Sequence, residues 1–481
     1  MINILIFIVG IGLCLQALIG LSFFVSSIRE NEKRAAVFGA IQFLGMLFLV
    51  ILFLYFLRIG VFQNTVGIAT LMSTFALGLI IAVVLIRRSG ANSKAIAGTK
   101  GLIVGKVKPY DEREIVFARN RSLPPDSGMY QQFYEKHPQW EAYDSARRKK
   151  GGPLGNPGTI DSPHDRSNVA AMFASQSIPL SLSTADKIRP RSHPLFQEQR
   201  IDLEPETATQ KIRGFTRSLG ADLVGIAEIN PLWVYSHRGE IFHENWEDWG
   251  REIDLTHKHA VVFATEMGFE LVGTAPHTPT AIASMGNYAK GAYIAVQLAA
   301  YIANLGYSAT ANHLRHYDLA LVPLAVDAGL GELGRLGYLM TKRFGPRIRL
   351  SAVTTDLPLK ADKPVDIGVE DFCRICKKCA LCCPSNSIPS EDQTQVNGTL
   401  RWKLNAETCF DYWGKVGTDC NICMRVCPWS HATTFPHKII RTLITRNRTA
   451  RRLFSVMDDI FYGRKPRPKA APNWAQFNAT S

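Results

Sequence analysis

Three long apolar segments open the chain, and none of them contains a charged residue. They cover residues 2–27, 35–57 and 61–86. Because about 20 apolar residues are enough to cross a hydrocarbon core near 30 Å thick, each segment predicts a transmembrane helix. A cleavable signal peptide would need a basic stretch and a shorter apolar run, and no twin-arginine pair precedes the first segment. The pattern therefore predicts a membrane anchor over residues 1–88.

Basic residues flank these segments unevenly, and the bias predicts an orientation. Arg29, Lys33 and Arg34 lie in the first loop, only Arg58 lies in the second, and Arg87 begins a basic run after the third segment. Under the positive-inside rule, everything after Arg87 is expected in the cytoplasm, below the inner membrane. The segments contain no His, Asp, Glu, Lys or Arg, so their expected role is anchorage, with a contact to a quinol left open.

Residues 89–195 are polar and rich in Gly, Pro and Arg, and such a stretch is expected to hold little regular structure by itself. A disordered linker is one interpretation. The other is an arm that lies against a folded body, which is favoured by the interspersed aromatic residues Tyr130, Phe133, Tyr134, Trp140 and Tyr143.

Regular periodicity returns near Glu204 and predicts a layered α/β body over residues 196–365. Helices are expected over the amphipathic or apolar segments 207–219 and 285–305, each followed by a glycine. Strands or further elements of the alternation are expected at 221–226, 259–265, 307–310, 319–326, 337–341 and 347–355.

Eight of the ten cysteines form two runs inside residues 366–435. The first run has the spacing C-x2-C-x2-C-x3-C-P, and the second repeats it with a longer first gap; the cysteines are Cys373, Cys376, Cys379, Cys383, Cys409, Cys420, Cys423 and Cys427. This spacing is typical of two [4Fe-4S] clusters in a ferredoxin-like module, in which the cysteine before proline binds the other cluster.

The crossing rule assigns the ligands of each cluster. Cys427 joins the first three cysteines, and Cys383 joins Cys409, Cys420 and Cys423. Zinc sites and disulfides are the alternatives, but zinc favours two separated cysteine pairs, and neither alternative explains two Cys-Pro endings. Cys14 and Cys382 are expected to be unreactive thiols.

Length and charge add two constraints. A chain of 481 residues can form two or three domains, and its formal net charge is +14. The basic residues are spread out rather than clustered for nucleic acid, with local enrichment after the membrane segments and in the tail over residues 436–481. This placement favours contact with anionic lipid headgroups, and a merely solvated basic surface is the alternative.

Glycines at 329, 331, 334 and 337 leave bare backbone that could approach a large ligand. The match to G-x-G-x-x-G is weak evidence for a dinucleotide, because no βαβ unit surrounds it. This block resembles the corrinoid-dependent reductive dehalogenases. The family resemblance extends to other segments, which follow one another in the same order as in the family: 220–225, 230–233, 325–341, 344–350 and the two cysteine motifs.

The resemblance implies a nitroreductase-like α/β body that holds a base-off, cobalamin-type corrinoid, fed with electrons by the ferredoxin-like module. It implies corrinoid contacts at Gly329, Gly331, Gly334 and Arg335. No Asp-x-His-x-x-Gly motif is present, so His313 and His316 are expected to be pocket or structural residues.

By position, the family's catalytic pair corresponds to Tyr288 as proton donor and Arg349 as the cation that stabilises its phenolate. A phenol with a pKa near 10 needs such a cation to act as an acid at neutral pH. Outside this resemblance, the two would be ordinary helix and strand residues. Arg335 and Arg347 are the weaker candidates for the cation, and Tyr317 and Tyr293 are the next tyrosines to test.

The chain is therefore predicted to be a membrane-anchored reductive dehalogenase that faces the cytoplasm and acts on an organohalide. Family members used in respiration are usually exported and have a separate anchor protein, whereas here the anchor is fused. The expected electron donor is a ferredoxin, a flavodoxin or a quinol. The alternatives are an enzyme resembling epoxyqueuosine reductase and an iron-sulfur electron-transfer subunit without a corrinoid.

Overall fold

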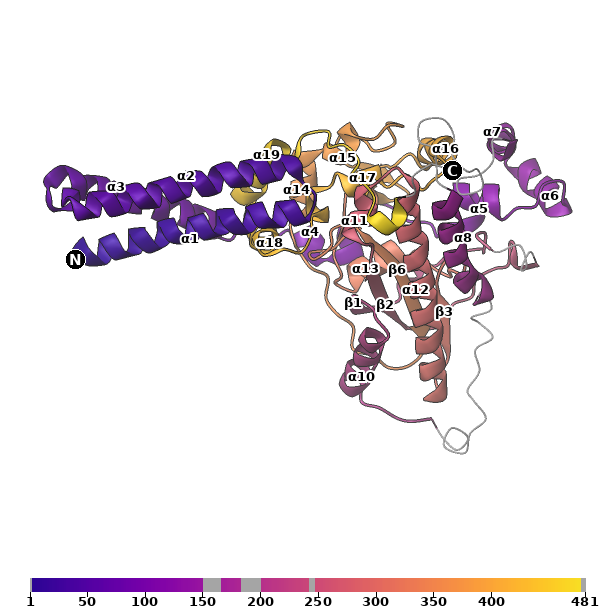
Figure 1. Ribbon diagram of the computed structural model, residues 1–481. Helices are drawn as coiled ribbons and strands as arrows, with labels where there is room; N and C mark the ends of the chain where they lie inside the picture. The colour runs from indigo at the N-terminus through magenta and orange to yellow at the C-terminus, as the bar shows by residue number, and fades with distance from the viewer. Residues whose placement is uncertain (1, 150–165, 183–199, 242–246, 477–481) are drawn as a thin grey trace. The chain divides into compact units, whose positions relative to one another are not determined.

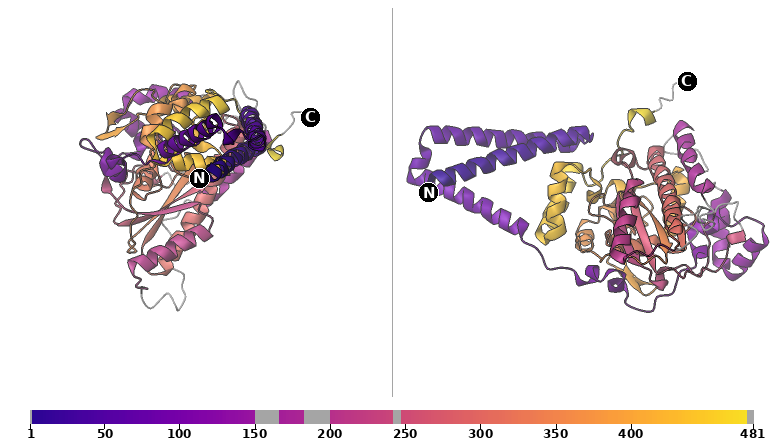
Figure 2. Two further views of the ribbon diagram at one scale, coloured as in Figure 1. Left: turned by 90° about the vertical axis from the view of Figure 1, so that its left-hand side faces the viewer. Right: turned by 90° about the horizontal axis from the view of Figure 1, so that it is seen from below.

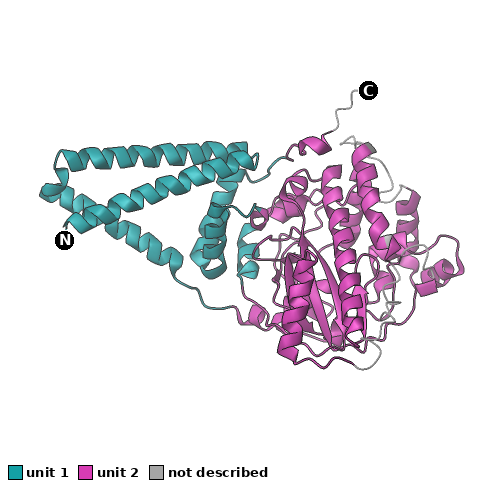
Figure 3. Ribbon diagram, turned by 60° about the horizontal axis from the view of Figure 1, so that its bottom comes forward, with its two compact units in different colours: residues 1–91, 367–376, 431–467 teal, residues 92–366, 377–430, 468–481 magenta. Residues whose placement is uncertain are grey.

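The computed structural model describes residues 2–149, 166–182, 200–241 and 247–476. The chain divides into two compact units, each built from segments that are distant in sequence (Figure 3). The first unit contains residues 1–91, 367–376 and 431–467, and the second contains residues 92–366, 377–430 and 468–481.

The first unit confirms three helices that are long and apolar enough to span a membrane: α1 (Ile2–Arg29), α2 (Lys33–Arg58) and α3 (Thr65–Ile86). Asn64 caps α3, because its side chain accepts a hydrogen bond from the Gly67 N–H at 2.8 Å. Most of the large apolar side chains of these helices are exposed, as is expected of surfaces that face lipid.

The same unit contains α14 (Val369–Cys376), α18 (Phe435–Arg446) and α19 (Arg448–Tyr462). The predicted basic tail therefore contains two helices, and their apolar faces pack on the anchor. Phe461 lies edge-on to Phe23 and Phe38, with ring centroids 5.4 and 5.3 Å apart. Asn447 Nδ2 also donates to the carbonyl oxygen of Val84 at 2.7 Å. Two of the tail's arginines, at 441 and 451, are buried in this packing.

A four-stranded sheet in the order β1-β2-β6-β3 forms the centre of the second unit, and all its strand pairs are antiparallel. The strands are β1 (Leu223–Glu228), β2 (His259–Glu266), β3 (Ala309–Asn312) and β6 (Ile348–Thr355). The helices α10 (Pro205–Ser218) and α12 (Thr278–Asn304) lie along one face, and α13 (Leu321–Asp327) lies on the other (Figures 1 and 2).

Side-chain alternation along β2 explains these layers. Val261 and Phe263 join the core under α10 and α12, whereas Ala260, Val262 and Ala264 join the core under α13. All five side chains are fully buried. The layered α/β body predicted from periodicity is therefore present, and its central strand is apolar on both faces.

The segment before this body is folded over its described residues. It forms α4 (Ser93–Ile96), α5 (Val116–Arg121), α6 (Gly128–Lys136), α7 (Pro138–Lys149) and α8 (Arg166–Ser181). Phe133 and Tyr134 pack with Ile241 and Trp249, which belong to the body. The expectation of little regular structure was therefore wrong here, because these aromatic side chains find a core to enter, as the arm interpretation proposed.

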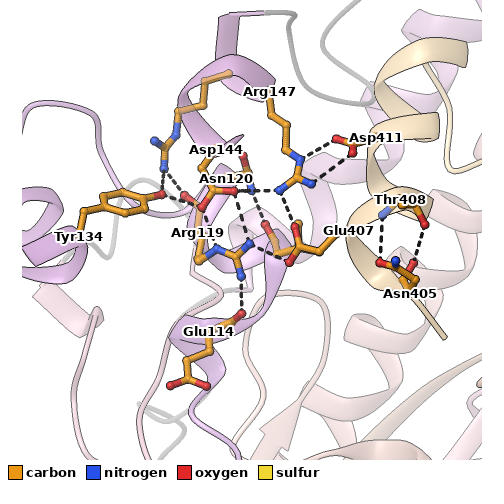
Figure 4. A network of polar contacts seen from close by, with 12 residues as sticks. Glu114, Arg119, Asn120, Tyr134, Asp144, Arg147, Asn405, Glu407, Thr408 and Asp411 are labelled. Carbon is orange, nitrogen blue, oxygen red and sulfur yellow. Dashed lines mark hydrogen bonds and ion pairs between the residues drawn. The ribbon is translucent and has the colours of Figure 1, made fainter. Parts of the chain in front are cut away.

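Ion pairs fix the arm to the cysteine-rich segment (Figure 4). Arg119, which is 1% exposed, pairs with Asp144 at 2.8 Å and with Glu407 at 2.9 Å. Arg147 pairs with Asp411 at 2.6 Å. Glu407 and Asp411 belong to α16 (Ala406–Val416). The remaining α-helices and β-strands of the described residues are α11 (Phe269–Gly273), β4 (Glu332–Leu333), β5 (Leu339–Met340), α15 (Lys378–Leu381), β7 (Thr394–Val396), β8 (Thr399–Arg401) and α17 (Ile422–Arg425).

Candidate active site

Tyr288 and Arg349, which are 61 positions apart in the sequence, lie side by side in the second unit. Tyr288 comes from α12 and Arg349 from β6, and the guanidinium carbon is 5.1 Å from the centroid of the tyrosine ring. Both line a cavity of about 110 Å³. The other lining residues are Phe117, Arg121, Gln176, Glu240, Met285, Leu314, Arg315, Tyr317, Trp413 and Asp419.

Asp419 and Ser284 hold the Arg349 guanidinium in place. Arg349 Nη2 donates to Ser284 Oγ at 2.8 Å and to Asp419 Oδ2 at 3.0 Å, and Ser284 Oγ also donates to Asp419. Asn421 Nδ2 donates to Ser284 Oγ at 3.1 Å. Burial alone would lower the pKa of Arg349, but the adjacent Tyr288 and Asp419 keep it above the ordinary value. The cation is therefore permanent.

Sequence reasoning did not find Asp419, Ser284 and Asn421. The signal available for two of them was position, since Asp419 and Asn421 flank the predicted ligand Cys420. Within the described part of the chain, Arg349 Nε and Asp419 Oδ1 are buried without a hydrogen-bond partner. Buried polar atoms without a hydrogen bond reduce the stability of a protein, and they are found chiefly where a function requires them.

Of the weaker candidates for the cation and the proton donor, only Tyr317 lines the cavity of Tyr288 and Arg349. Arg335 donates to the carbonyl oxygens of Pro389 and Glu391, both at 2.7 Å, and Arg347 pairs with Glu266 at 2.9 Å. Neither arginine lines the cavity. Among the other tyrosines, Tyr317 lines it, whereas Tyr293 is 52% exposed.

Four of the predicted cluster ligands surround a second cavity in the same unit. Cys383, Cys409, Cys420 and Cys423 all line it, and this is the set that the crossing rule assigns to one cluster. Trp413 and Asp419 line both this cavity and that of the Tyr288 pair, so the two cavities share a wall.

The surroundings of these four thiols are suited to a bound metal. Burial raises the pKa of Cys409 to about 11 and that of Cys420 to about 12, so these thiolates need a bound cation. Burial also acts to raise the pKa of Cys383, but hydrogen bonds from Ser385 and from the Ser387 N–H, at 3.3 Å from the sulfur, lower it. Four soft donors with N–H···S bonds fit an iron-sulfur cluster.

Cys373, Cys376, Cys379 and Cys427 are each buried, with exposed fractions between 6% and 8%. Cys373 and Cys376 belong to the first unit and the other two to the second, so this ligand set stays a prediction. All ten cysteines are free, and no three metal-binding side chains converge on one ion position in the described part of the chain. The choice between iron-sulfur clusters, zinc and disulfides therefore stays with the cysteine spacing.

The glycines predicted to approach the corrinoid have neighbours within the protein. A Cβ atom at Gly329 would meet the carbonyl oxygen of Lys363, and one at Gly331 or Gly334 would meet Met340. Gly329 also has a φ of +69°, which favours glycine. Packing of the chain therefore accounts for these glycines, and their contact with a corrinoid remains untested.

His313 and His316 are buried and stack on each other, with ring centroids 5.8 Å apart. His313 Nε2 lies 3.0 Å from the carbonyl oxygen of Leu182, and burial lowers the pKa of His313 to about 4. Neither ring lines the cavity of the Tyr288 pair. Their geometry fits the predicted structural role.

No family model matches the chain, but curated proteins and solved structures do. The chain is 34% identical over 280 residues to a tetrachloroethene reductive dehalogenase of Desulfitobacterium hafniense, which covers 49% of this chain and 50% of the relative. It is 34% identical over 120 residues to an epoxyqueuosine reductase of Cyclobacterium marinum, covering 24% of this chain and 37% of the relative.

Among solved structures, the chain is similar to the catabolic reductive dehalogenase NpRdhA in complex with 3-bromo-4-hydroxybenzoic acid. That similarity has a TM-score of 0.59 and 27% identity and covers 79% of this chain and 49% of the other. The chain thus spans about half the length of its dehalogenase relatives. The predicted resemblance to reductive dehalogenases is confirmed in sequence and in structure.

Proposed function

Because this chain is a homologue of the reductive dehalogenases, we propose that it is a membrane-anchored enzyme that removes halogen from an organohalide by reduction. The observation that carries the proposal is the wall shared by two cavities. One holds the Tyr288 and Arg349 pair and the other is lined by four cysteines, with Trp413 and Asp419 between them. Electrons held among the cysteines would have a short path to the cavity of the pair.

Tyr288 is the proposed proton donor to the carbon that loses halogen, and Arg349 stabilises the phenolate that forms. The Arg349 guanidinium carbon lies 5.1 Å from the centroid of the Tyr288 ring, and a cation this near to the ring supports an ionised phenol. Asp419 and Ser284 restrict the guanidinium to this position, which reduces the reorganisation needed when charge develops on the tyrosine.

The proposal includes two [4Fe-4S] clusters and one corrinoid. Cys383, Cys409, Cys420 and Cys423 would hold one cluster, and Cys373, Cys376, Cys379 and Cys427 would hold the other, completing the ferredoxin-like module. When bound, the corrinoid supplies the reductive cleavage of the carbon-halogen bond. A nitroreductase-like body and corrinoid contacts at Gly329, Gly331, Gly334 and Arg335 remain predictions from the family resemblance.

The three apolar helices support a membrane anchor in the proposed enzyme. The proposed orientation has the catalytic body on the cytoplasmic side, as the distribution of basic residues predicts. Anionic headgroups would then meet the exposed basic residues of the tail, and the electron donor would be a ferredoxin, a flavodoxin or a quinol.

Two other functions compete with this one. An epoxyqueuosine reductase would have an acidic residue where Tyr288 stands, and the similarity to that enzyme covers a quarter of the chain. An electron-transfer subunit would need the cysteines, but it would have no use for the partly buried Tyr288 and Arg349 beside them, or for the buried Asp419 that pairs with Arg349.

Metal analysis and turnover test the proposal together. The protein, purified without oxygen, should contain about eight iron atoms and one cobalt, and it should release halide from an organohalide when reduced viologen is supplied. About eight iron atoms without cobalt, and no halide release from a broad panel, would favour the electron-transfer subunit instead.

A further inference from the structure

In the first unit, α19 joins the ends of two of the apolar helices. Its N-cap residue Asn447 donates from Nδ2 to the carbonyl oxygens of Val84 and Arg87, at 2.7 and 2.5 Å, where α3 ends. Near the other end of α19, the carbonyl oxygen of Ile460 accepts a hydrogen bond from Arg34 Nε at 2.8 Å, where α2 begins. A chain that crosses a membrane in α2 and returns in α3 has the start of α2 and the end of α3 at the same membrane surface. The 15 residues of α19, about 22 Å in length, therefore lie along that surface.

Contacts on two sides of α19 fix its rotation about its own axis. Arg451 Nη1 lies 3.1 Å from Asp371 of α14, and Asp458 Oδ1 lies 2.6 Å from His431 Nε2. Arg451 and Asp458 are seven residues apart, so both contacts are on one side of the helix. Phe461, on a second side, packs edge-on against aromatic rings of α1 and α2. These contacts give the remaining sides of α19 a definite direction.

A third side of α19 carries an exposed apolar stripe, which consists of Leu453, Val456 and Ile460. Their spacing of three and four residues puts them on one face, and their exposed fractions are 43%, 58% and 45%. Arg452, which is exposed too, is nine residues from Phe461 and so lies on the side of the helix opposite to it. The stripe lies between these two sides. Contact of the three side chains with water is unfavourable, and contact with an apolar environment would remove that cost.

We infer that α19 is an interfacial helix whose stripe of Leu453, Val456 and Ile460 enters the acyl layer of the lipid beside the three spans. The inference rests on the membrane anchor of the proposed function and adds a second lipid contact to it. An amphipathic helix with a charged face lies in the plane of the interface, with its apolar face about 5–10 Å into the boundary between headgroups and acyl chains.

The neighbours of the stripe support lipid as its partner. Phe461 is next to Ile460 in the sequence and packs on α1 and α2, whose own large apolar side chains are mostly exposed. The stripe therefore continues an apolar surface that the anchor already presents to lipid. This contact is apolar, and it is distinct from the attraction of basic side chains to anionic headgroups.

Fluorescence quenching from the two sides of the interface tests the inference. The full-length protein is purified without oxygen, labelled with bimane at Leu453→Cys and placed in lipid nanodiscs. We expect lipids brominated on their acyl chains to remove more than about half of the bimane emission, because the stripe reaches the acyl chains. Aqueous iodide should have little effect on this label.

Arg452→Cys is the matched control, because it is the neighbouring position and points away from the side that packs on the anchor. Its label should show the reverse pattern, with quenching by iodide and little by brominated lipid. The wild-type protein, treated in the same way, gives the background from Cys14 and Cys382, and the iron content of each variant checks that it is folded. Ile460→Cys is a second position on the stripe and should behave like Leu453→Cys.

Three results would overturn the inference. The first is strong iodide quenching of the labels at Leu453→Cys and Ile460→Cys without quenching by brominated lipid. The second is shielding of these labels from both quenchers, since protein would then cover the stripe. The third is equal quenching by brominated lipid at positions 452 and 453. Extraction of the wild-type protein from membranes by alkaline carbonate would instead contradict the proposed anchor, so the two failures can be told apart.

Discussion

The substitution Tyr288→Phe keeps the ring beside the Arg349 guanidinium and removes only the phenolic hydroxyl group, which carries the transferable proton. Turnover with reduced viologen should therefore fall by about 100-fold or more, the scale expected for loss of a general acid. Iron and cobalt content should stay at the wild-type level. Near-normal turnover in a fully loaded variant would mean that another group is the acid, and Tyr317, which lines the same cavity, would be tested next.

Arg349 is tested by two substitutions that differ in charge. Arg349→Ala removes the cation and leaves Asp419, which is 4% exposed at its side chain, without its ion pair. We expect a large loss of turnover and of thermal stability. Arg349→Lys keeps a positive charge and should recover part of both, although one ammonium group cannot reproduce the guanidinium geometry. Equal turnover in the two variants would contradict the role of the charge.

At the scale of elements, Glu112 joins the arm to the body and makes this junction sensitive to pH. Glu112 is 1% exposed, and its Oε2 accepts hydrogen bonds from the N–H groups of Gly239 and Glu240 at 2.8 and 3.0 Å. Burial and the nearby Glu240 carboxylate raise the pKa of Glu112 from 4.5 to about 8.

Between pH 4.5 and about 8, the Glu112 carboxyl group thus keeps its proton in the folded protein and loses it in the unfolded chain. This contribution to stability is full below about pH 4.5 and is lost as the pH rises through about 8. Glu112→Gln can accept the same two hydrogen bonds without ionising. The melting temperature of the variant should match that of the wild type near pH 5 and exceed it near pH 8, and a constant difference across this range would contradict the assignment.

The cysteine runs are tested as elements by the residue that crosses between them. Cys383 follows the first run in sequence but lies with Cys409, Cys420 and Cys423 around one cavity. Cys383→Ala should therefore damage the cluster of the second run and leave that of the first. Electron paramagnetic resonance of the reduced protein separates the two signals, and loss of the first-run cluster alone would reverse the ligand assignment.

Element boundaries show where sequence periodicity was insufficient. The helix predicted over residues 285–305 begins at Thr278, seven positions earlier, and the added turns contribute Ser284 to the site. Those turns are rich in Thr, Ala and Ser, so they carry no apolar period. Pro279 in the first turn was the available signal, since proline is favoured where a helix starts.

For the whole molecule, the testable property is orientation in the membrane. A reporter enzyme that is active only in the cytoplasm should be active when it is fused after Arg88, because basic residues follow the third span. A second fusion in the loop at residues 59–60, between α2 and α3, should give the opposite result. Periplasmic activity of the Arg88 fusion would restore the exported arrangement that is usual for the family.

Patterns within short segments of the sequence were sufficient to predict some features of the structure. Hydrophobic length alone predicted the three apolar helices, and alternation predicted the four strands of the sheet. Cysteine spacing predicted two ligand sets, and the structure gathers one of them, Cys383, Cys409, Cys420 and Cys423, around one cavity. Each of these signals lies within a short segment, because helix periodicity, strand alternation and metal-ligand spacing act between near neighbours.

Tertiary structure alone decided which distant residues meet at the cavity. Arg121, Tyr288, Arg349 and Asp419 come from four separate segments. Only the register of β6 on β2 and the packing of α5, α12 and the cysteine-rich segment bring them together. The pairing of Arg349 with Asp419 was invisible in the sequence for the same reason. Whether an arginine has a counter-charge depends on which carboxylates the fold places near it, and spacing along the chain does not carry that information.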